Sequence, residues 1–300
     1  MQPIRHLVIL GVGLIGGSLA RALRAAGAVQ RITGVGRGEA NLKRAVELGV
    51  IDDYSFDASA AVQSADMVFV AVPLGAFEAL FAEIAPHLPK GCIVTDGGSS
   101  KASVLAAARR HLPGSVHFVA GHPLAGTENS GVEASFAELY RGRLCLLTPS
   151  ADTETTALAR VRWMWAQCGA RVELLDAAAH DRMLAAVSHL PHVAAFALVN
   201  AVCKMSDEQA GLDPFRYAAG GFRDFTRIAS SSPEMWRDIA LHNREALLGS
   251  IEGLRAELAE LHAAIAAGDG ERLLNEFAAA KAARDGWLAR QAALATGGTS

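Results

Sequence analysis

The chain has 300 residues, 51% of them hydrophobic and 20% charged, so it can bury a core large enough for two domains. Its 28 basic and 31 acidic residues give a formal net charge of -3, which excludes a broad electrostatic attraction to nucleic acid or to an anionic membrane surface. The four cysteines are far apart, form no C-x-x-C pair and lie in apolar surroundings, as reduced, packed cysteines do. With no signal-peptide pattern after Met1 and no apolar stretch of about 18 residues, we expect a cytoplasmic protein that binds no membrane.

Residues 1–176 repeat one rhythm, in which a short β-branched or apolar run precedes a polar turn and an alanine- and leucine-rich segment. This alternation predicts an α/β domain with a parallel sheet flanked by helices, and ligands bind such sheets outside the carboxyl ends of the strands. The expected strands are His6 to Leu10, Arg31 to Val35, Asp66 to Val72, Cys92 to Thr95, His117 to Val119, Leu144 to Leu147 and Arg171 to Leu175.

After Asp176 the β-branched runs stop and long helical patterns begin, so we expect an all-helical second domain over residues 177–296. Its first helix is expected from Ala177 to Lys204. A later helix carries apolar residues at alternating spacings of four and three, a seam typical of a helix packed on another helix: Leu247, Ile251, Leu254, Leu258, Leu261 and Ile265.

Gly268-Asp269-Gly270 breaks this seam helix, and a second helix from Glu271 to about Leu294 is expected to fold back antiparallel. It carries Leu274, Phe277 and Trp287. The seam can pack within one chain, but seams this long late in a helical domain favour a homodimer.

The run from Leu7 to Leu10 is followed by the glycine pattern Gly11-x-Gly13-x-x-Gly16 and then by a helical pattern. Gly11 allows the sharp turn, Gly13 lets the backbone approach a pyrophosphate, and Gly16 lets strand and helix pack closely, while Leu14 and Ile15 begin the helix. A glycine-rich turn without a ligand is the plainer alternative. The strand–turn–helix order favours a Rossmann domain that binds a nicotinamide dinucleotide.

The second expected strand ends at Gly34-Val35-Gly36-Arg37, where an NAD enzyme usually carries an acidic residue for the ribose hydroxyl. Gly36 repels no 2′-phosphate and Arg37 can attract one, so NADP is a serious candidate, although Arg37 can also be a solvated turn residue. Glu39 is close enough to keep NAD possible. Val72 and Pro73 end the next strand and are expected to line the cofactor cleft, or else only to stop that strand.

Two further polar segments each follow an expected strand: residues 95–101 (TDGGSSK) and residues 121–128 (GHPLAGTE). Both should therefore lie at the ligand edge of the sheet. Oxidation of an alcohol needs a hydride acceptor and a base whose pKa is near neutral, and histidine is the usual base. A histidine before a proline is commonly a turn or core residue, but the position of His122 at this edge makes it the candidate base.

The segments GLIGGSLA, DGGSSK, GHPLAGTENSG, VSHLPH and GGFRDFTRIASSSPEMWRDI occur in this order between residues 11 and 239. Together they resemble the successive motifs of the prephenate and arogenate (cyclohexadienyl) dehydrogenase family. The resemblance implies an enzyme of tyrosine biosynthesis that oxidises the ring hydroxyl of prephenate or arogenate with NAD or NADP. Loss of carbon dioxide then gives 4-hydroxyphenylpyruvate or tyrosine. No residue here obviously distinguishes the two substrates.

By this resemblance His122 deprotonates the ring hydroxyl, and Ser99 orients both His122 and that hydroxyl. Thr127 and Glu128 belong to the same pocket. Prephenate is a dianion, so a chain of negative net charge needs a fixed cation, and an arginine can bind a carboxylate through two hydrogen bonds. Arg227 matches the family's substrate arginine, with Arg223 as a second candidate.

Three histidines follow the expected domain boundary, and the resemblance places His180, His189 and His192 on the substrate side of the cleft. The spacing of three between His189 and His192 is compatible with a metal site. However, Pro191 lies between them and no cysteine or carboxylate completes a ligand set, so we expect no metal. Each of these histidines can equally be an ordinary packed helix residue.

Two other functions stay open from the sequence alone. One is a β-hydroxyacid or 6-phosphogluconate-type dehydrogenase, although Lys204 is a poor positional match for the catalytic lysine of that group. The other is a cofactor-binding sensor that keeps the fold without the chemistry. The small-molecule substrate, rather than the dinucleotide, distinguishes these possibilities.

Overall fold

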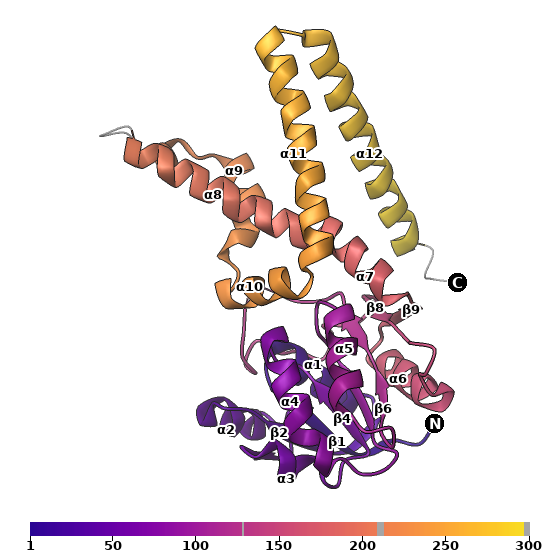
Figure 1. Cartoon of the computed structure of the whole chain (residues 1–300). Helices are drawn as coiled ribbons and strands as arrows, with labels where there is room; N and C mark the ends of the chain where they lie inside the picture. Colours follow the sequence, from indigo (N-terminus) through magenta and orange to yellow (C-terminus); the bar gives the residue numbers. More distant parts are fainter. Residues whose placement is uncertain (128, 209–212, 297–300) are drawn as a thin grey trace. The chain divides into compact units, whose positions relative to one another are not determined.

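The computed structural model describes residues 1–127, 129–208 and 213–296, and the chain divides into two compact units between Leu247 and Leu248 (Figure 1). The first unit is built on a six-stranded sheet of order β3-β2-β1-β4-β5-β6, in which every neighbouring pair is parallel. This is the strand order of doubly wound dinucleotide-binding domains. Its strands are β1 (Ile4–Leu10), β2 (Val29–Val35), β3 (Asp53–Ser55), β4 (Met67–Val70), β5 (Ile93–Asp96) and β6 (His117–Val119).

Both faces of this sheet are buried, which explains why its central strands are continuously apolar. Along β1, Leu7 and Ile9 point into one hydrophobic cluster and Val8 and Leu10 into the other. Helices α1 (Leu14–Ala25), α2 (Glu39–Glu47) and α6 (Thr155–Gln167) supply the first cluster. Helices α3 (Ala58–Val62), α4 (Phe77–Ile84) and α5 (Ala102–His111) supply the second. The α/β sandwich predicted from the alternating pattern is confirmed.

A second, three-stranded sheet corrects one detail of the expected topology. The runs expected at Leu144 to Leu147 and Arg171 to Leu175 do form strands, β8 (Leu144–Leu147) and β9 (Arg171–Leu174). However, they pair with each other in a separate sheet, in which β8 also pairs antiparallel with β7 (Gly121–Pro123). Strand β7 could not be predicted from the sequence, because three residues that include a glycine and a proline carry no strand periodicity. His122 therefore lies on a strand rather than in a loop.

The expected helix from Ala177 to Lys204 is interrupted. Helix α7 (Ala177–Leu184) passes through a π-helical turn at Ala185–His189 into α8 (Leu190–Glu208). Pro191 has no N–H to donate to the preceding turn and its ring crowds the carbonyl of Val187, so a regular α-helix cannot run through this point. Helices α9 (Gly220–Thr226) and α10 (Pro233–His242) follow, with a 3₁₀ turn at Arg227–Ser230 between them.

Helices α11 (Arg244–Ala267) and α12 (Gly270–Thr296) form the antiparallel hairpin predicted from the sequence (Figure 1). Gly268, at φ +66°, ends the first of them. Packing between the two helices leaves much of the apolar seam exposed, because Leu258, Ile265 and Phe277 are all more than half exposed. The hairpin therefore carries an exposed apolar face, which is typical of a surface that packs against another molecule.

The glycine turn between β1 and α1 has the geometry that its sequence predicts. Gly11 adopts φ +102°, and a Cβ there would lie 2.4 Å from the carbonyl oxygen of Ala71. A Cβ on Gly16 would lie 2.2 Å from the carbonyl oxygen of Gly11. Around Gly13, in contrast, nothing lies within 4 Å. Gly11 and Gly16 are thus required by the fold itself, whereas Gly13 borders open space.

We expect Gly16→Ala to lower the free energy of unfolding by about 1–3 kcal/mol, because its new methyl group collides with backbone that cannot move aside. The better helix propensity of alanine, roughly 1 kcal/mol, works against this loss. The matched control is Gly13→Ala, which should change stability by only about 0.5 kcal/mol or less. Urea denaturation of both variants measures the difference, and equal stabilities would contradict this account of the turn.

Candidate active site

His122 lies at the centre of a buried polar cluster formed by β7, α7 and the loop that follows β5. Its side chain is 8% exposed, and its Nδ1 atom lies 2.9 Å from Nε2 of His180. The two rings meet edge to face, with centroids 5.1 Å apart. Nδ1 of His180 lies in turn 2.8 Å from Oδ1 of Asp181. Three side chains thus form one hydrogen-bonded line that ends at a carboxylate.

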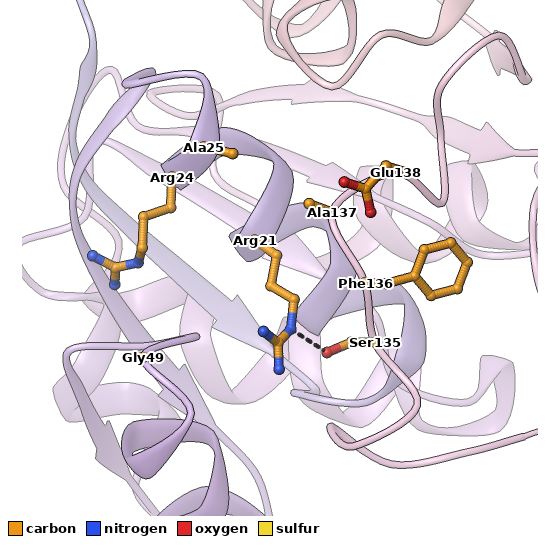
Figure 2. Close-up of a pocket in the computed structure, with 8 residues that line it drawn as sticks. All are labelled: Arg21, Arg24, Ala25, Gly49, Ser135, Phe136, Ala137 and Glu138. Atoms are coloured by element: carbon orange, nitrogen blue, oxygen red, sulfur yellow. Dashed lines mark hydrogen bonds between the residues drawn. The ribbon is translucent and has the colours of Figure 1, made fainter.

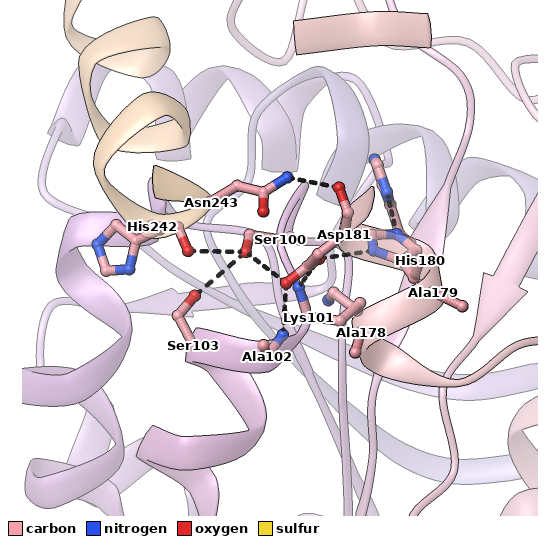
Figure 3. Close-up of polar contacts among 12 residues, drawn as sticks. Ser100, Lys101, Ala102, Ser103, Ala178, Ala179, His180, Asp181, His242 and Asn243 are labelled. Atoms are coloured by element: carbon pink, nitrogen blue, oxygen red, sulfur yellow. Dashed lines mark hydrogen bonds and ion pairs between the residues drawn. The ribbon is translucent and has the colours of Figure 1, made fainter. Parts of the chain in front are cut away.

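The Asp181 carboxylate ties α7 to the beginning of α5, as Figure 3 shows. It accepts hydrogen bonds from the backbone N–H groups of Lys101 at 2.8 Å and Ala102 at 2.9 Å, and from the Ser100 hydroxyl at 3.2 Å. Burial by itself raises the pKa of Asp181. The hydrogen bonds from His180 and from the two backbone groups outweigh burial and leave this pKa below its ordinary value, so the carboxylate is ionised.

A second buried carboxylate, Asp96 at the end of β5, forms an ion pair with Lys101, and both side chains are fully buried. Lys101 Nζ also donates to the carbonyl oxygen of Gly121 at 2.7 Å, while the Gly121 N–H donates to Asp96 Oδ1 at 2.9 Å. The ion pair therefore holds both polar backbone groups of the residue before His122. It fixes where β7 begins and, with it, the position of the His122 ring.

The surroundings of His122 keep its ring neutral. Burial lowers the pKa of His122 well below 6.5, and the neighbouring His180, Lys101 and His189 lower it further when they carry positive charge. The unprotonated ring is the form that can accept a proton.

The other two predicted histidines lie together around Trp236. His189 is buried and its Nδ1 atom lies 3.1 Å from Nδ2 of Asn243; burial lowers the pKa of His189 to about 4. The His192 ring stacks on Trp236 with centroids 3.6 Å apart. Burial lowers the pKa of His192, and the positive charge of Arg227 lowers it further. Over the described parts of the chain, no group of three His, Cys, Asp or Glu side chains could hold a metal ion.

The remaining predicted substrate residues lie at the surface. Arg223 and Arg227 are exposed, with Arg227 beginning the 3₁₀ turn that packs against α8. Thr127 is exposed and accepts a hydrogen bond from the Asn129 N–H at 3.3 Å.

The predicted roles of Ser99 and Glu128 in this pocket stay predictions. Ser99 is half-buried in the loop after β5, and His122 hydrogen-bonds to His180 rather than to it. Glu128 lies outside the described residues.

The predicted cofactor residues lie where the strand order reverses, between β1 and β4. Gly11 abuts Ala71 and Val72, and Pro73 follows. Helix α1 begins at Leu14 with Gly13 as its N-cap and no side-chain cap, so the N–H groups of Leu14 and Ile15 are available to phosphate oxygens. The open space at Gly13 and these N–H groups fit a dinucleotide pyrophosphate.

At the end of β2, Gly36 is partly buried against Leu42 and Arg37 is exposed. No hydrogen bond or ion pair involves Arg37 within the described part of the chain. Glu39, the nearby carboxylate, forms an ion pair with Lys43 at 2.9 Å. Among the described residues, the Arg37 guanidinium is thus the unpaired charge at the end of β2.

Asp96, Lys101, Asp181 and Asn243 were not predicted as site residues. Asp96 and Lys101 lie in the segment whose position drew attention to Ser99, so strand-end placement could have identified them. Asp181 follows His180 directly, but an Asp on a helix pattern is ordinarily solvated. Asn243 Nδ2 donates to the Asp181 carbonyl oxygen at 2.8 Å, a contact that no sequence pattern signals.

A surface pocket of about 540 Å³ lies away from these residues, lined in part by Arg21, Arg24, Phe136 and Glu138 (Figure 2). Arg21 donates a hydrogen bond there to the Ser135 hydroxyl at 2.9 Å. None of the predicted site residues lines this pocket. The chemistry-bearing groups converge instead around His122.

A doubly wound sheet with an uncapped glycine turn at its switch point and a neutral, buried histidine nearby defines a Rossmann-type, nucleotide-binding oxidoreductase. Residues 19–174 match the family model of the prephenate dehydrogenase nucleotide-binding domain, and residues 176–279 match that of the prephenate dehydrogenase dimerization domain. The chain belongs to the prephenate dehydrogenase family. The family resemblance and the nucleotide-binding domain that the motifs predicted are both confirmed.

Individual relatives match this chain over nearly its whole length. The cyclohexadienyl dehydrogenase of Zymomonas mobilis is 40% identical over 95% of this chain and 96% of its own length. The crystal structure of Aquifex aeolicus prephenate dehydrogenase with hydroxyphenyl propionate and NAD+ is 38% identical, with a TM-score of 0.89 over 94% of this chain and 97% of that one. Synechocystis arogenate dehydrogenase is 31% identical, with a TM-score of 0.78 over 94% and 99%.

We expect Lys101→Met to lower the free energy of unfolding by about 3–5 kcal/mol, because it leaves the Asp96 carboxylate buried without a counter-charge. The matched control is Arg110→Met, which removes the exposed ion pair with Glu78 and should leave the urea midpoint nearly unchanged. Adding Asp96→Asn to Lys101→Met should restore part of the loss. Equal midpoints for Lys101→Met and the control would refute the structural role of this pair.

Proposed function

We propose that this enzyme oxidises prephenate or arogenate with NAD(P)+ and releases carbon dioxide, which gives 4-hydroxyphenylpyruvate or tyrosine. The observation that carries the proposal is a neutral, buried His122 at the ligand edge of the sheet, in a chain that matches both domains of the family. The relatives include cyclohexadienyl, prephenate and arogenate dehydrogenases, so we propose both prephenate and arogenate as candidate substrates.

The reaction requires little covalent chemistry from the protein itself. The bound oxidised nicotinamide supplies the hydride acceptor. As the ring carbon loses its hydride, His122 takes the hydroxyl proton, and the ring carboxylate leaves as carbon dioxide with its bonding electrons remaining in the ring. Aromatisation drives this last step, so the protein mainly positions the substrate and polarises its hydroxyl.

The substrate's two carboxylates need cations, and we propose that exposed Arg227 binds one of them, with Arg223 in support. His192 and Trp236 would pack beside the substrate, because their stacked rings lie next to the Arg227 charge. His189, Ser99, Thr127 and Glu128 complete the proposed pocket. We do not assign His180 a direct contact with the substrate, because both of its ring nitrogens already have protein partners.

For the cofactor, we propose that the glycine turn holds the pyrophosphate and that Arg37 donates hydrogen bonds to a 2′-phosphate, so that NADP as well as NAD is used. The exposed guanidinium and the engagement of Glu39 by Lys43 support this assignment.

We also propose a domain boundary at residue 176 and a homodimer formed through the helical part. The two family models meet at residues 174 and 176, and Asp176 caps α7 by accepting from the N–H groups of Ala178 and Ala179.

The helix over Ala177–Met205 is long and apolar enough to cross a membrane by length and composition, with mean hydropathy 1.5 and 11% of that window buried. One such helix is weak evidence of a membrane span, and we assign its apolar surface, with that of α11 and α12, to a second copy.

The proposed activity is tested by assaying prephenate and arogenate with NAD and with NADP. Turnover of at least one pair is expected. Arg37→Ala should lower kcat/KM with NADP by about tenfold and leave kcat/KM with NAD almost unchanged, since it removes one charged hydrogen bond. Nucleotide binding without turnover of either substrate would favour a sensor, and turnover of only a simple hydroxy acid would favour the hydroxyacid dehydrogenase alternative.

Variants of the two proposed key residues should fail in different ways. His122→Asn should bind nucleotide normally but lose about 10²–10⁴-fold in kcat, because the base is gone. Arg227→Ala should raise KM much more than it lowers kcat, because it mainly weakens substrate binding. In the unmodified enzyme, the low pKa of His122 keeps the base unprotonated in mildly acidic solution. The acid-side fall of kcat/KM should therefore begin below pH 6.5, and a fall centred above pH 7 would contradict this assignment.

Dimer formation is checked by analytical ultracentrifugation at micromolar concentration, where we expect about twice the chain mass of 31.4 kDa. Leu258→Asp and Phe277→Asp, each on an exposed part of the hairpin, should shift the protein toward monomer, because a charge opposes burial of that face. Glu257→Asp is the matched control on α11, the helix that carries Leu258. A wild-type monomer would refute the proposed assembly.

A further inference from the structure

We infer that His180 and Asp181 are positioning residues that hold His122 in the tautomer whose Nε2 atom is free to accept the substrate's proton. The inference rests on the proposed function for its chemistry, but its geometry stands on the hydrogen bonds among these three side chains. None of the three needs to move for the line to act, because each is already within hydrogen-bond distance of the next.

The hydrogen-bonded line ends at the Asp181 carboxylate. Oδ1 accepts from the Lys101 N–H and Oδ2 accepts from the Ala102 N–H and the Ser100 hydroxyl. Backbone N–H groups can only donate, so those of Lys101 and Ala102 place a hydrogen against each carboxylate oxygen and favour the ionised form. The carboxylate is therefore ionised, and the His180 Nδ1 atom beside Oδ1 must carry a hydrogen.

In its neutral form His180 carries one hydrogen, so with that hydrogen on Nδ1 it has a lone pair on Nε2. That atom lies 2.9 Å from Nδ1 of His122, a distance that requires one hydrogen between the two nitrogens. His122 must supply it. Its own single hydrogen then lies on Nδ1, and its Nε2 atom is left as the base.

The same line stabilises the charge that the reaction creates. When Nε2 of His122 accepts a proton, the ring becomes a cation in a buried site beside the positive charge of Lys101. The His122 Nδ1–H then donates to His180, whose other nitrogen donates to the Asp181 anion. The negative charge of Asp181 thus acts through His180 to favour the protonated ring in the transition state. The Asp96 carboxylate cannot serve this purpose because Lys101 already neutralises it.

A purely structural role is the alternative, in which His180 only fills space beneath β7. Two substitutions separate the possibilities. His180→Gln can accept from His122 Nδ1 through its amide oxygen and donate to Asp181 through its amide nitrogen, so it keeps the tautomer without a ring. His180→Leu fills much of the same volume and offers no acceptor.

In the full-length enzyme, we expect His180→Leu to lower kcat by about 10²-fold while KM for the substrate changes by about twofold or less, because only orientation and charge stabilisation are lost. His180→Gln should keep kcat within about tenfold of the unmodified enzyme. Nucleotide affinity by calorimetry and the urea midpoint serve as folding controls for both variants. Comparable losses for both substitutions, or a kcat for His180→Leu close to that of the unmodified enzyme, would overturn the inference.

A direct reading of the tautomer does not depend on activity. In protein labelled with ¹⁵N-histidine, the His122 signals are assigned by their absence in His122→Asn. We expect a protonated Nδ1 and an unprotonated Nε2 in the unmodified protein, and loss of this preference in His180→Leu. The opposite tautomer in the unmodified protein would overturn the inference even if prephenate is turned over. Failure of the unmodified enzyme to turn over any cyclohexadienyl substrate would instead count against the proposed function alone.

Discussion

The ion pair between Asp96 and Lys101 is the constraint on which the candidate active site depends. Two fully buried charges at the end of β5 are tolerated because they neutralise each other and because their remaining hydrogen-bonding capacity is used by Gly98 and Gly121. Those backbone contacts join the parallel sheet to the small second sheet at the residue before His122. A charged pair here acts as a geometric clamp, since a buried charge has few places where it can be satisfied.

The segment that begins α5 is held from its other side by Asp181. This carboxylate accepts from the first N–H groups of α5, where the positive end of a helix favours an anion. One anion therefore caps a helix of the nucleotide-binding domain and also ends the hydrogen-bonded line to His122. Packing of α7 against α5 and orientation of the candidate base thus follow from the same few bonds, so the two cannot vary independently.

Burial favours the neutral form of both kinds of group in this cluster. It keeps the His122 ring neutral, which suits a base, whereas hydrogen bonds keep Asp181 ionised despite burial. The cofactor edge achieves its chemistry differently. There the backbone itself is the ligand-binding surface, so side chains are excluded by close contacts at Gly11 and Gly16 and left out at Gly13.

The sequence by itself determined the alternating α/β half, the helical half, the glycine turn and the family, because periodicity and motifs are local properties of the chain. It also placed His122 at the ligand edge. Only the tertiary structure decided that His122 lies on β7 and that its neighbours are His180 and Asp181. Contacts between residues 58 positions apart depend on how sheets and helices pack, and pairing preferences of single polar residues are too weak to predict such contacts.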